Sequence, residues 1–300
     1  MVTEAPPLRA ELLAAGLLVE TGVNGLYARS GDFERIVDGL AAMVTRAAAA
    51  DRPAVLRFPP VFPRAAFERT DYIRSFPDLT GGITTFVGGD RDHARLLGLV
   101  EDGADWAAAL TPSELMLCSA TCHPLYPTLA GRLPAGGRLI DLHGWCFRHE
   151  PSLDPARMQA FRQHELVFVG EPELAVAHRD RWVERAQNLC SELGLAVEAE
   201  VANDPFFGRA GRVLAVAQRD EALKIELTIP VANEAPTAVV SSNCHREHFG
   251  EAFGISTADG DVAHSACVGF GVERMTLALL ASHGLDPDAW SAPVRAVLWP

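Results

Sequence analysis

Hydrophobic and polar positions follow a helical rhythm early in the chain. In SGDFERIVDGLAAMVTRAAAADRP, apolar residues recur at steps of three and four residues, which is typical of an amphipathic helix. Ser30 and Asp32 are its candidate N-caps, and Pro53 ends it. A short strand follows in AVLRFPP, and residues 90–109 carry a second helical pattern within a turn-rich stretch. We therefore expect this first part to be mainly helical.

From residue 111 onward the pattern favours strands. Strand-like segments are ELMLCSATCHPLYP, RLIDLHGWCFRHE, QAFRQHELVFVG, RVLAVAQ, ALKIELTIP and TAVVSSNCHREHFG. A helix that stops at Gly194 divides them, and GFGVERMTLALLASHGL predicts a strand running into a helix closed by Gly284. Hairpin-like strands with helices before and after them indicate an α+β fold with an antiparallel sheet flanked by helices. We expect a single domain over residues 1–300, with a helical insert near 171–196.

Composition narrows the functional classes. Three hundred residues at 48% hydrophobic suffice for a large buried core, and no apolar run reaches the ~18 residues that span a membrane. Acidic residues near the N-terminus are unlike a secretory signal, so we expect a cytoplasmic protein. A net charge of −13 repels polyphosphate backbones, which disfavours a nucleic acid as partner. Because disulfides are rare in the cytoplasm, we expect the six scattered cysteines to be core residues, metal ligands or reactive thiols and not disulfide partners.

The stretch Gly144–Gly170 concentrates charge in an apparent hairpin. A two-residue period places Arg148 and Glu150 on one face of the incoming strand, and Phe161, Gln163 and Glu165 on one face of the outgoing strand. A guanidinium grips phosphate oxygens and an aromatic ring stacks on a base. This combination suits ATP. The alternative is a surface hairpin whose arginines pair with nearby acids.

A second pattern, CVGFGVERMTLALL, supports a nucleotide site. Gly269 and Gly271 leave the backbone of a strand open to a flat group, and Arg274 stands where an apolar helix begins. Arg274 occupies the third glycine position of a dinucleotide-binding fingerprint, and no parallel βαβ unit surrounds it. The pattern therefore does not indicate a Rossmann site.

In this order, the two stretches resemble the second and third signature motifs of class II aminoacyl-tRNA synthetases. The resemblance implies that Arg148 holds the α-phosphate of ATP and that Glu150 contacts the adenine. It places Arg157 by the terminal phosphates and Phe161 against one face of the adenine, with Arg274 over the other face and the γ-phosphate. Such fixed cations stabilise an in-line displacement in which an amino-acid carboxylate attacks the α-phosphorus. The product implied is an aminoacyl adenylate.

Between these motifs, KIELTIPVANEAPTAVVSSNCHREHFG resembles the seryl-tRNA synthetase segment that ends in paired serines, here Ser241 and Ser242. The seryl enzymes carry a metal-binding glutamate just before that pair, where this chain has Val239. Glu226 is the replacement we consider for Mg²⁺. Ser242 joins it among the expected cofactor contacts.

The archaeal type of seryl enzyme binds the substrate amine through zinc held by Cys, Glu and Cys. The matching residues are Cys122, Glu165 and Cys267, and three protein ligands with an open fourth position are typical of a catalytic zinc. Cys118 and His123 remain alternative ligands. The resemblance favours Cys122 over Cys118. We expect the other thiols to be packing residues: Cys146, Cys190 and Cys244.

From about residue 30 to the end, the chain resembles the amino acid:[carrier protein] ligases, which are truncated homologues of the archaeal seryl enzymes. TCHPLYPT, FRHEPS, RQHELVFVG and CVGFGVERM carry this resemblance. It implies activation of glycine or alanine by ATP and transfer to the phosphopantetheine thiol of a small carrier protein, in a homodimer. No basic heptad-bearing arm precedes the second motif, which argues against tRNA charging. The alternatives are a tRNA-related seryl-tRNA synthetase paralogue and a catalytically inactive regulatory homologue.

AHRDRWVERAQ is a candidate docking surface for the carrier, because Arg179, Arg181 and Arg185 surround Trp182. His178 adds to this basic cluster. The alternative is a solvated helix face with its tryptophan turned inward.

Overall fold

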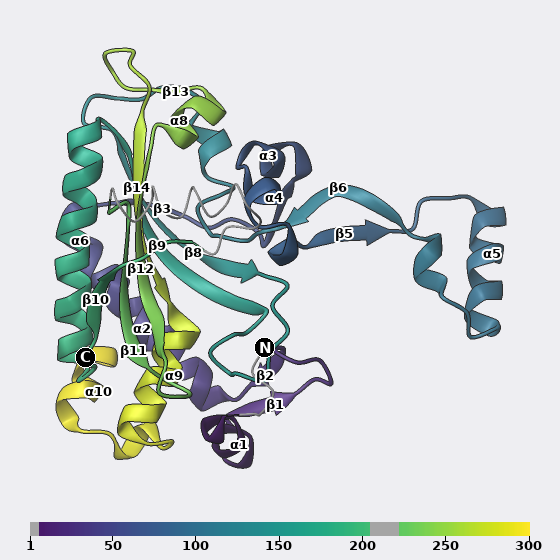
Figure 1. Ribbon diagram of the computed structural model, residues 1–300, viewed down its shortest axis with the longest axis horizontal. Helices are drawn as coiled ribbons and strands as arrows, with labels where there is room; N and C mark the ends of the chain where they lie inside the picture. The colour runs from purple at the N-terminus through teal and green to yellow at the C-terminus, as the bar shows by residue number, and fades with distance from the viewer. Residues whose placement is uncertain (1–5, 205–221) are drawn as a thin grey trace.

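The computed structural model describes residues 6–204 and 222–300 and is built around a seven-stranded sheet (Figure 1). Its strand order is β10-β11-β12-β14-β9-β8-β3, and neighbours are antiparallel except β3, which runs parallel to β8. The strands are β3 (Ala54–Leu56), β8 (Arg138–Phe147), β9 (Ala160–Gly170), β10 (Glu198–Val201), β11 (Lys224–Pro230), β12 (Pro236–Arg246) and β14 (His264–Gly271). The α+β, antiparallel fold expected from the sequence is confirmed. The strand expected in RVLAVAQ lies outside the described residues.

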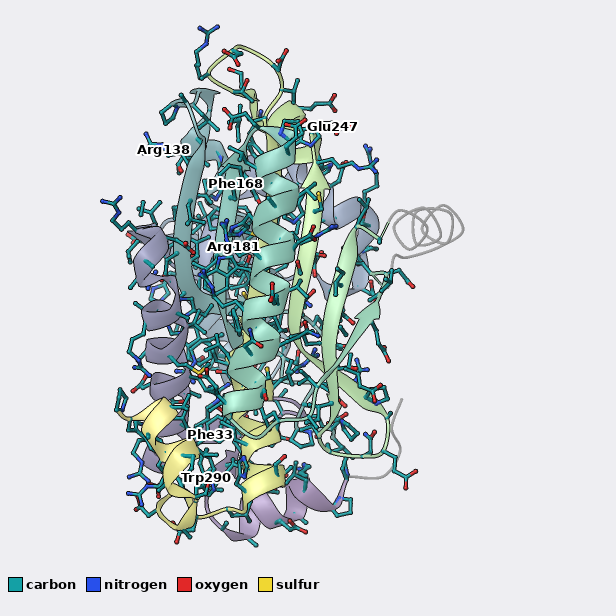
Figure 2. The ribbon with its side chains drawn as sticks, turned by 90° about the vertical axis from the view of Figure 1, so that its left-hand side faces the viewer. Phe33, Arg138, Phe168, Arg181, Glu247 and Trp290 are labelled. Carbon is teal, nitrogen blue, oxygen red and sulfur yellow. The ribbon has the colours of Figure 1, made fainter. Side chains whose placement is uncertain are left out.

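Helices cover one face of this sheet (Figures 1 and 2). The long ones are α2 (Gly31–Ala48), α6 (Pro172–Glu192) and α9 (Val272–His283), with α1 (Pro7–Ala14) and α10 (Ala292–Leu298) beside them. Within α2, Ser30 caps the first turn by accepting a hydrogen bond from the Phe33 backbone at 3.2 Å, as predicted. Phe33, Ile36 and Leu40 then form a buried stripe at helical spacing. This packing leaves the opposite face of the sheet for other contacts.

Helix α6 contributes to the core instead of presenting an aromatic anchor. Trp182 is 0% exposed, and His178 is buried with Nε2 donating to the Leu166 carbonyl at 3.0 Å. Arg185 pairs with Asp51 at 2.6 Å. Because the tryptophan points into the protein, the expectation that it anchors a docking surface is wrong, and the inward-turned alternative is confirmed.

Shorter elements complete the fold. The strands β1 (Leu18–Glu20) and β2 (Tyr27–Arg29) pack into the same core as the long helices. The other face carries β4 (Val61–Pro63), α3 (Arg64–Arg69), α4 (Tyr72–Ser75), β7 (Gly131–Arg132), α8 (His248–Phe253) and β13 (Ile255–Ser256). Helix α8 packs on β12 and β14, where Phe249 stacks on Tyr126 with ring centroids 3.8 Å apart. No helix in the described ranges is long and apolar enough to cross a membrane.

An arm projects from α3 and α4, formed by β5 (Gly82–Thr85), α5 (Asp90–Glu101) and β6 (Thr111–Leu117) (Figure 1). Helix α5 lies within the helical pattern predicted for 90–109 but ends earlier. None of residues 82–117, all of which the structure describes, is buried. Strand β6 ends at Leu117, before the expected strand does, and the chain turns there towards the sheet.

Candidate active site

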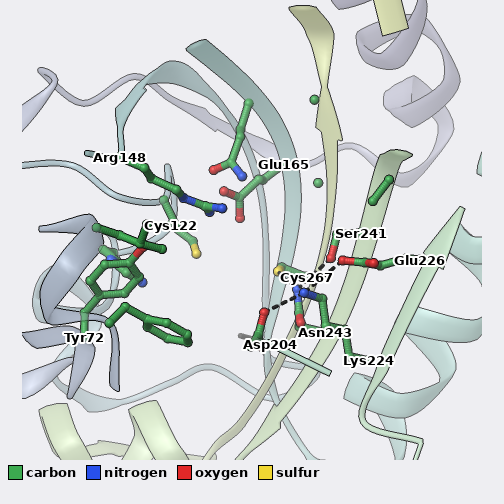
Figure 3. Close-up of a pocket in the computed structure, with 18 of the residues that line it drawn as sticks. Tyr72, Cys122, Arg148, Glu165, Asp204, Lys224, Glu226, Ser241, Asn243 and Cys267 are labelled. Carbon is green, nitrogen blue, oxygen red and sulfur yellow. Dashed lines mark hydrogen bonds and ion pairs between the residues drawn. The ribbon is translucent and has the colours of Figure 1, made fainter. Parts of the chain in front are cut away.

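The face of the sheet opposite the long helices forms one wall of a cavity of about 560 Å³ (Figure 3). Strands β9, β11, β12 and β14 supply this wall, α4 and α8 contribute side chains, and the turn after β6 closes another side. A volume of this size is typical of small-molecule sites. Arg148, Glu150, Phe161, Gln163 and Glu165 all line it, so the residues that alternation placed on one face of each strand share one pocket.

Strand register arranges the lining residues in rows across the sheet. Paired residues on neighbouring strands point to the same side, and alternate residues along a strand do likewise. Gly271 belongs to the first row, beside Arg274. The middle row is Glu226, Ser241, Gly269 and Glu165, and the last row includes Lys224, Asn243 and Cys267. One end of the cavity therefore lies at Gly271 and Arg274, in the segment that resembles the third signature motif, and we call it the motif 3 end. The opposite end lies at Cys267 and is the Cys267 end.

Cys122, Glu165 and Cys267 meet in this cavity, each offering a ligand atom within 4.8 Å of the others. The turn after β6 brings Cys122 there, and the Thr121 backbone N–H donates to Glu165 Oε1 at 3.0 Å. Gly269 gives Glu165 its space, because a Cβ there would lie 3.2 Å from Glu165 Cγ. The three residues predicted as zinc ligands are thus close enough to share one ion.

The electrostatics of the triad favour a cation. Burial, with the neighbouring Cys267 sulfur, raises the pKa of Glu165 to about 8. A hydrogen bond to the Cys267 sulfur and burial raise the pKa of Cys122 well above its usual value, and the same bond lowers the pKa of Cys267. Glu165 Oε2 is buried without a hydrogen-bond partner in the described structure. Two sulfurs and an unsatisfied carboxylate oxygen fit Zn²⁺, which accepts this donor set.

The alternative ligands lie outside this cluster. Cys118 packs with Phe62 and does not line the cavity, and its Sγ lies 3.6 Å from the Pro59 carbonyl. His123 lines the cavity among aromatic rings, with its ring centroid 5.4 Å from that of Tyr72. Burial lowers the pKa of His123 to about 3, so it is neutral at physiological pH.

At the motif 3 end, two arginines face the cavity beside an aromatic ring. The Arg148 guanidinium carbon lies 5.4 Å from the Phe161 ring centroid, and Arg148 Nε donates to the Ser119 carbonyl at 3.1 Å. Arg274 donates to the Ala156 carbonyl at 2.9 Å and to the Ala238 carbonyl at 3.1 Å. These neutral acceptors hold the guanidinium groups without neutralising them, so both stay available to an anionic ligand.

Two predicted contacts lie elsewhere. Arg157 is half exposed, is not among the cavity-lining residues and pairs with Glu150 at 2.6 Å. Ser242 points to the other side of β12, where its Oγ is buried without a hydrogen-bond partner among the described residues. Ser241 lines the cavity instead, as strand alternation requires. Glu226 does line the cavity, paired with Lys224 at 2.9 Å.

Sequence reasoning missed the polar residues at the Cys267 end. Lys224, Asp204 and Asn243 all line the cavity there (Figure 3). The alternation in KIELTIP, which sets Lys224 on the same face as Glu226, was the available signal.

Two proteins of known name are similar to this chain in sequence along most of their length. Amino acid–[acyl-carrier-protein] ligase 1 of Bradyrhizobium diazoefficiens is 44% identical over 289 residues, which cover 95% of this chain and 88% of that protein. Ligase 2 of the same organism is 41% identical, over 99% of this chain and 89% of its own length. The chain belongs to the amino acid–[acyl-carrier-protein] ligase family. No family model matches it.

More distant relatives of this ligase family member are synthetases. The type-2 serine–tRNA ligase of Methanopyrus kandleri is 29% identical over 87% of this chain and 53% of that protein. The M. kandleri seryl-tRNA synthetase solved with A. aeolicus tRNASec matches with a TM-score of 0.83 at 22% identity, over 98% of this chain and 60% of that one. The Pyrococcus horikoshii seryl-tRNA synthetase complexed with ATP matches with a TM-score of 0.71 at 16% identity, over 99% of this chain and 63% of that one. The fold is that of a class II synthetase catalytic domain.

Proposed function

We propose that this protein uses ATP to activate a small amino acid, glycine or alanine, and transfers it to the phosphopantetheine thiol of a carrier protein. One observation carries the proposal. The Cys122–Glu165–Cys267 triad and the arginine-lined end belong to the same cavity, which supports binding of an amine and a triphosphate side by side. Membership of the ligase family supports the carrier protein as acceptor.

In the first step, an oxygen of the amino-acid carboxylate attacks the α-phosphorus of ATP and pyrophosphate leaves, giving an aminoacyl adenylate. Arg148 neutralises charge on the α-phosphate. Phe161 and Arg274 hold the adenine between them, and Glu150 contacts its edge, while Arg157 reaches the terminal phosphates from the rim. Fixing both reactants in this way supplies orientation and charge stabilisation, the main requirements of phosphoryl chemistry.

The triad holds the amino acid for this step. Cys122, Glu165 and Cys267 would bind Zn²⁺, which supplies a Lewis-acid site for the substrate amine. Glu226 is our candidate contact for the Mg²⁺ that accompanies ATP, and Ser241, its register partner on β12, lies beside it. Mg²⁺ binds carboxylate oxygens together with substrate phosphates, which suits a position on the middle row of the cavity.

In the second step, the carrier's thiol attacks the adenylate carbonyl and AMP leaves, so a thioester forms. The nucleophile belongs to the partner, and no enzyme cysteine has to react. The assembly we propose is a cytoplasmic homodimer that does not charge tRNA. The net charge of −13 agrees with that last point, because it weakens attraction to a polyanion.

Amino-acid-dependent exchange of radiolabelled pyrophosphate into ATP tests the first step. We expect exchange with glycine or alanine and loss of exchange when zinc is chelated. Thioester formation on phosphopantetheinylated carrier proteins then tests the second step. Absence of exchange with all twenty amino acids would falsify the proposal.

A matched pair of cysteine variants tests the metal assignment. Cys267→Ala removes one thiolate, so we expect loss of bound zinc and of amino-acid activation while ATP still binds. Cys118→Ala removes a buried thiol that lies outside the cavity, and we expect it to keep zinc and exchange. Zinc content, ATP affinity and exchange are measured for both. Full zinc content in Cys267→Ala would rule out the triad as the zinc site.

A further inference from the structure

Lys224 occupies a position that the nucleotide and metal residues leave unexplained. It is buried at the start of β11, in the register row that contains Asn243 and Cys267. Cys267 is four residues along β14 from Gly271, or about 13 Å at strand spacing. Lys224 therefore lies at the opposite end of the wall from Arg274, in the register row of the triad residue Cys267.

The Lys224 ammonium group is fixed by acids on both sides. Its Nζ lies 2.5 Å from Asp204 Oδ1 and 2.9 Å from Glu226 Oε1 (Figure 3). Asn243, the register partner of Lys224 on β12, contacts the triad: its Nδ2 is 3.9 Å from Cys267 Sγ, and it is 3.4 Å from Ser241 Oγ. The Cys267 end of the cavity thus has a charged, hydrogen-bonding wall.

We propose that Lys224, fixed by Asp204 and Glu226 beside Asn243, selects the substrate by polarity as well as size, so that apolar side chains beyond alanine are rejected. The inference rests on the proposed function. An apolar group pressed against a buried ion pair displaces water without replacing its hydrogen bonds, which is costly. A hydroxyl of the same size can donate to or accept from this wall. A wall acting by size alone would treat the two side chains alike.

Serine and 2-aminobutyrate distinguish selection by polarity from selection by size alone. Their side chains contain the same number of non-hydrogen atoms, and only that of serine carries a hydroxyl. Calorimetry on the wild-type protein with each aminoacyl-sulfamoyl-adenosine, a stable analogue of the adenylate, measures the preference without catalysis. We expect the seryl analogue to bind about tenfold tighter, in the range by which a pocket discriminates a small group. Equal affinities, or tighter binding of the 2-aminobutyryl analogue, would overturn the inference.

Lys224→Met replaces the ammonium with an apolar group on a chain of similar length. We expect the serine preference to fall about tenfold in both analogue binding and pyrophosphate exchange, towards parity or reversal. Lys224→Arg, which keeps the charge, should retain it. An unchanged preference in folded Lys224→Met overturns the inference, and if that variant does not fold, the wild-type ratio decides. Wild-type protein that binds neither analogue and exchanges with no amino acid would refute the proposed function itself, a separate result.

Discussion

At the residue scale, the triad depends on a glycine that takes no part in chemistry. Glu165 on β9 lies close to the sulfur of Cys267 on β14 and to that of Cys122 in the turn after β6, and the residue of β14 paired with Glu165 is Gly269. A side chain there would compete with Glu165 for the same space, since an added Cβ would be 3.2 Å from Glu165 Cγ. Gly269 therefore leaves the room that Glu165 needs at the proposed metal site.

We expect Gly269→Ala to weaken zinc binding by about 10- to 100-fold while the protein stays folded, because a carboxylate ligand is displaced. Gly271→Ala is the matched control. An added Cβ at that position meets only ordinary contacts, the nearest being the Val239 carbonyl at 3.5 Å, so zinc binding should be unchanged. Metal-competition titration measures both affinities. Equal affinities in the two variants would contradict the role assigned to Gly269.

The raised pKa of Glu165 gives zinc binding a pH dependence. Below about pH 8 the metal-free carboxyl is protonated and must lose its proton to bind the ion, so zinc affinity should rise between pH 6 and 8. Between about pH 4.5 and 8, the folded metal-free protein keeps this proton, whereas the unfolded chain has lost it. The free energy of unfolding of the metal-free protein therefore falls as pH rises through this range, by at most about 1.4 kcal/mol per pH unit. The gap in Tm between zinc-loaded and metal-free protein should therefore widen as pH rises. In Glu165→Gln, which has no proton to lose, this widening should be smaller.

Part of the site could be predicted from the sequence because strand alternation is local. Phe161, Gln163 and Glu165 were placed on one face by their spacing, and the structure confirms it. Cys122 lies in a turn, where no periodicity fixes direction, so only the family resemblance indicated it. For Ser242 the resemblance supplied a pair of serines, and alternation alone decides which of the two faces the cavity.

At the scale of elements, a buried ion cluster joins β9 to the helices behind the sheet. Arg162 donates to Glu34 of α2 at 2.6 and 2.9 Å, and to Glu273 at the start of α9 at 2.8 Å. The Arg162 backbone N–H donates to the same Glu273 carboxylate at 2.6 Å. This cluster fixes the first turn of α9, and so the position of Arg274. Sequence reasoning did not find it, because the three partners are far apart along the chain.

Glu273→Ala should destabilise the fold by about 3–5 kcal/mol, because it leaves the buried Arg162 charge short of a partner. Glu34→Ala is the comparison, since the Glu34 side chain is 35% exposed and water can replace it, at a cost of about 1 kcal/mol. Urea unfolding measures both. We also expect Glu273→Ala to weaken ATP binding through Arg274. A loss for Glu34→Ala as large as that for Glu273→Ala would show that burial does not set the cost.

At the scale of the whole molecule, the sheet ends in two unlike edge strands. Strand β3 is exposed along its length, with Val55 58% exposed, and it comes from the segment AVLRFPP. Strand β10 at the other edge has Val201 45% exposed. An exposed apolar edge strand is prone to pair with another chain. The arm of β5, α5 and β6 follows β3 in the chain and has no buried residue, which the helical pattern of 90–109 alone did not reveal.

We therefore expect the proposed homodimer to form through the β3 edge, where a two-fold axis would bring two identical strands together. Val55→Lys adds a charge to that edge and should shift the protein to monomer by at least about tenfold in dissociation constant, because each buried lysine would lack a partner. Val201→Lys, the same change at the β10 edge, should leave the dimer intact. Sedimentation equilibrium measures both variants against the wild-type protein. A monomeric wild type would refute the dimer, and dissociation by Val201→Lys but not by Val55→Lys would place the interface at the opposite edge of the sheet.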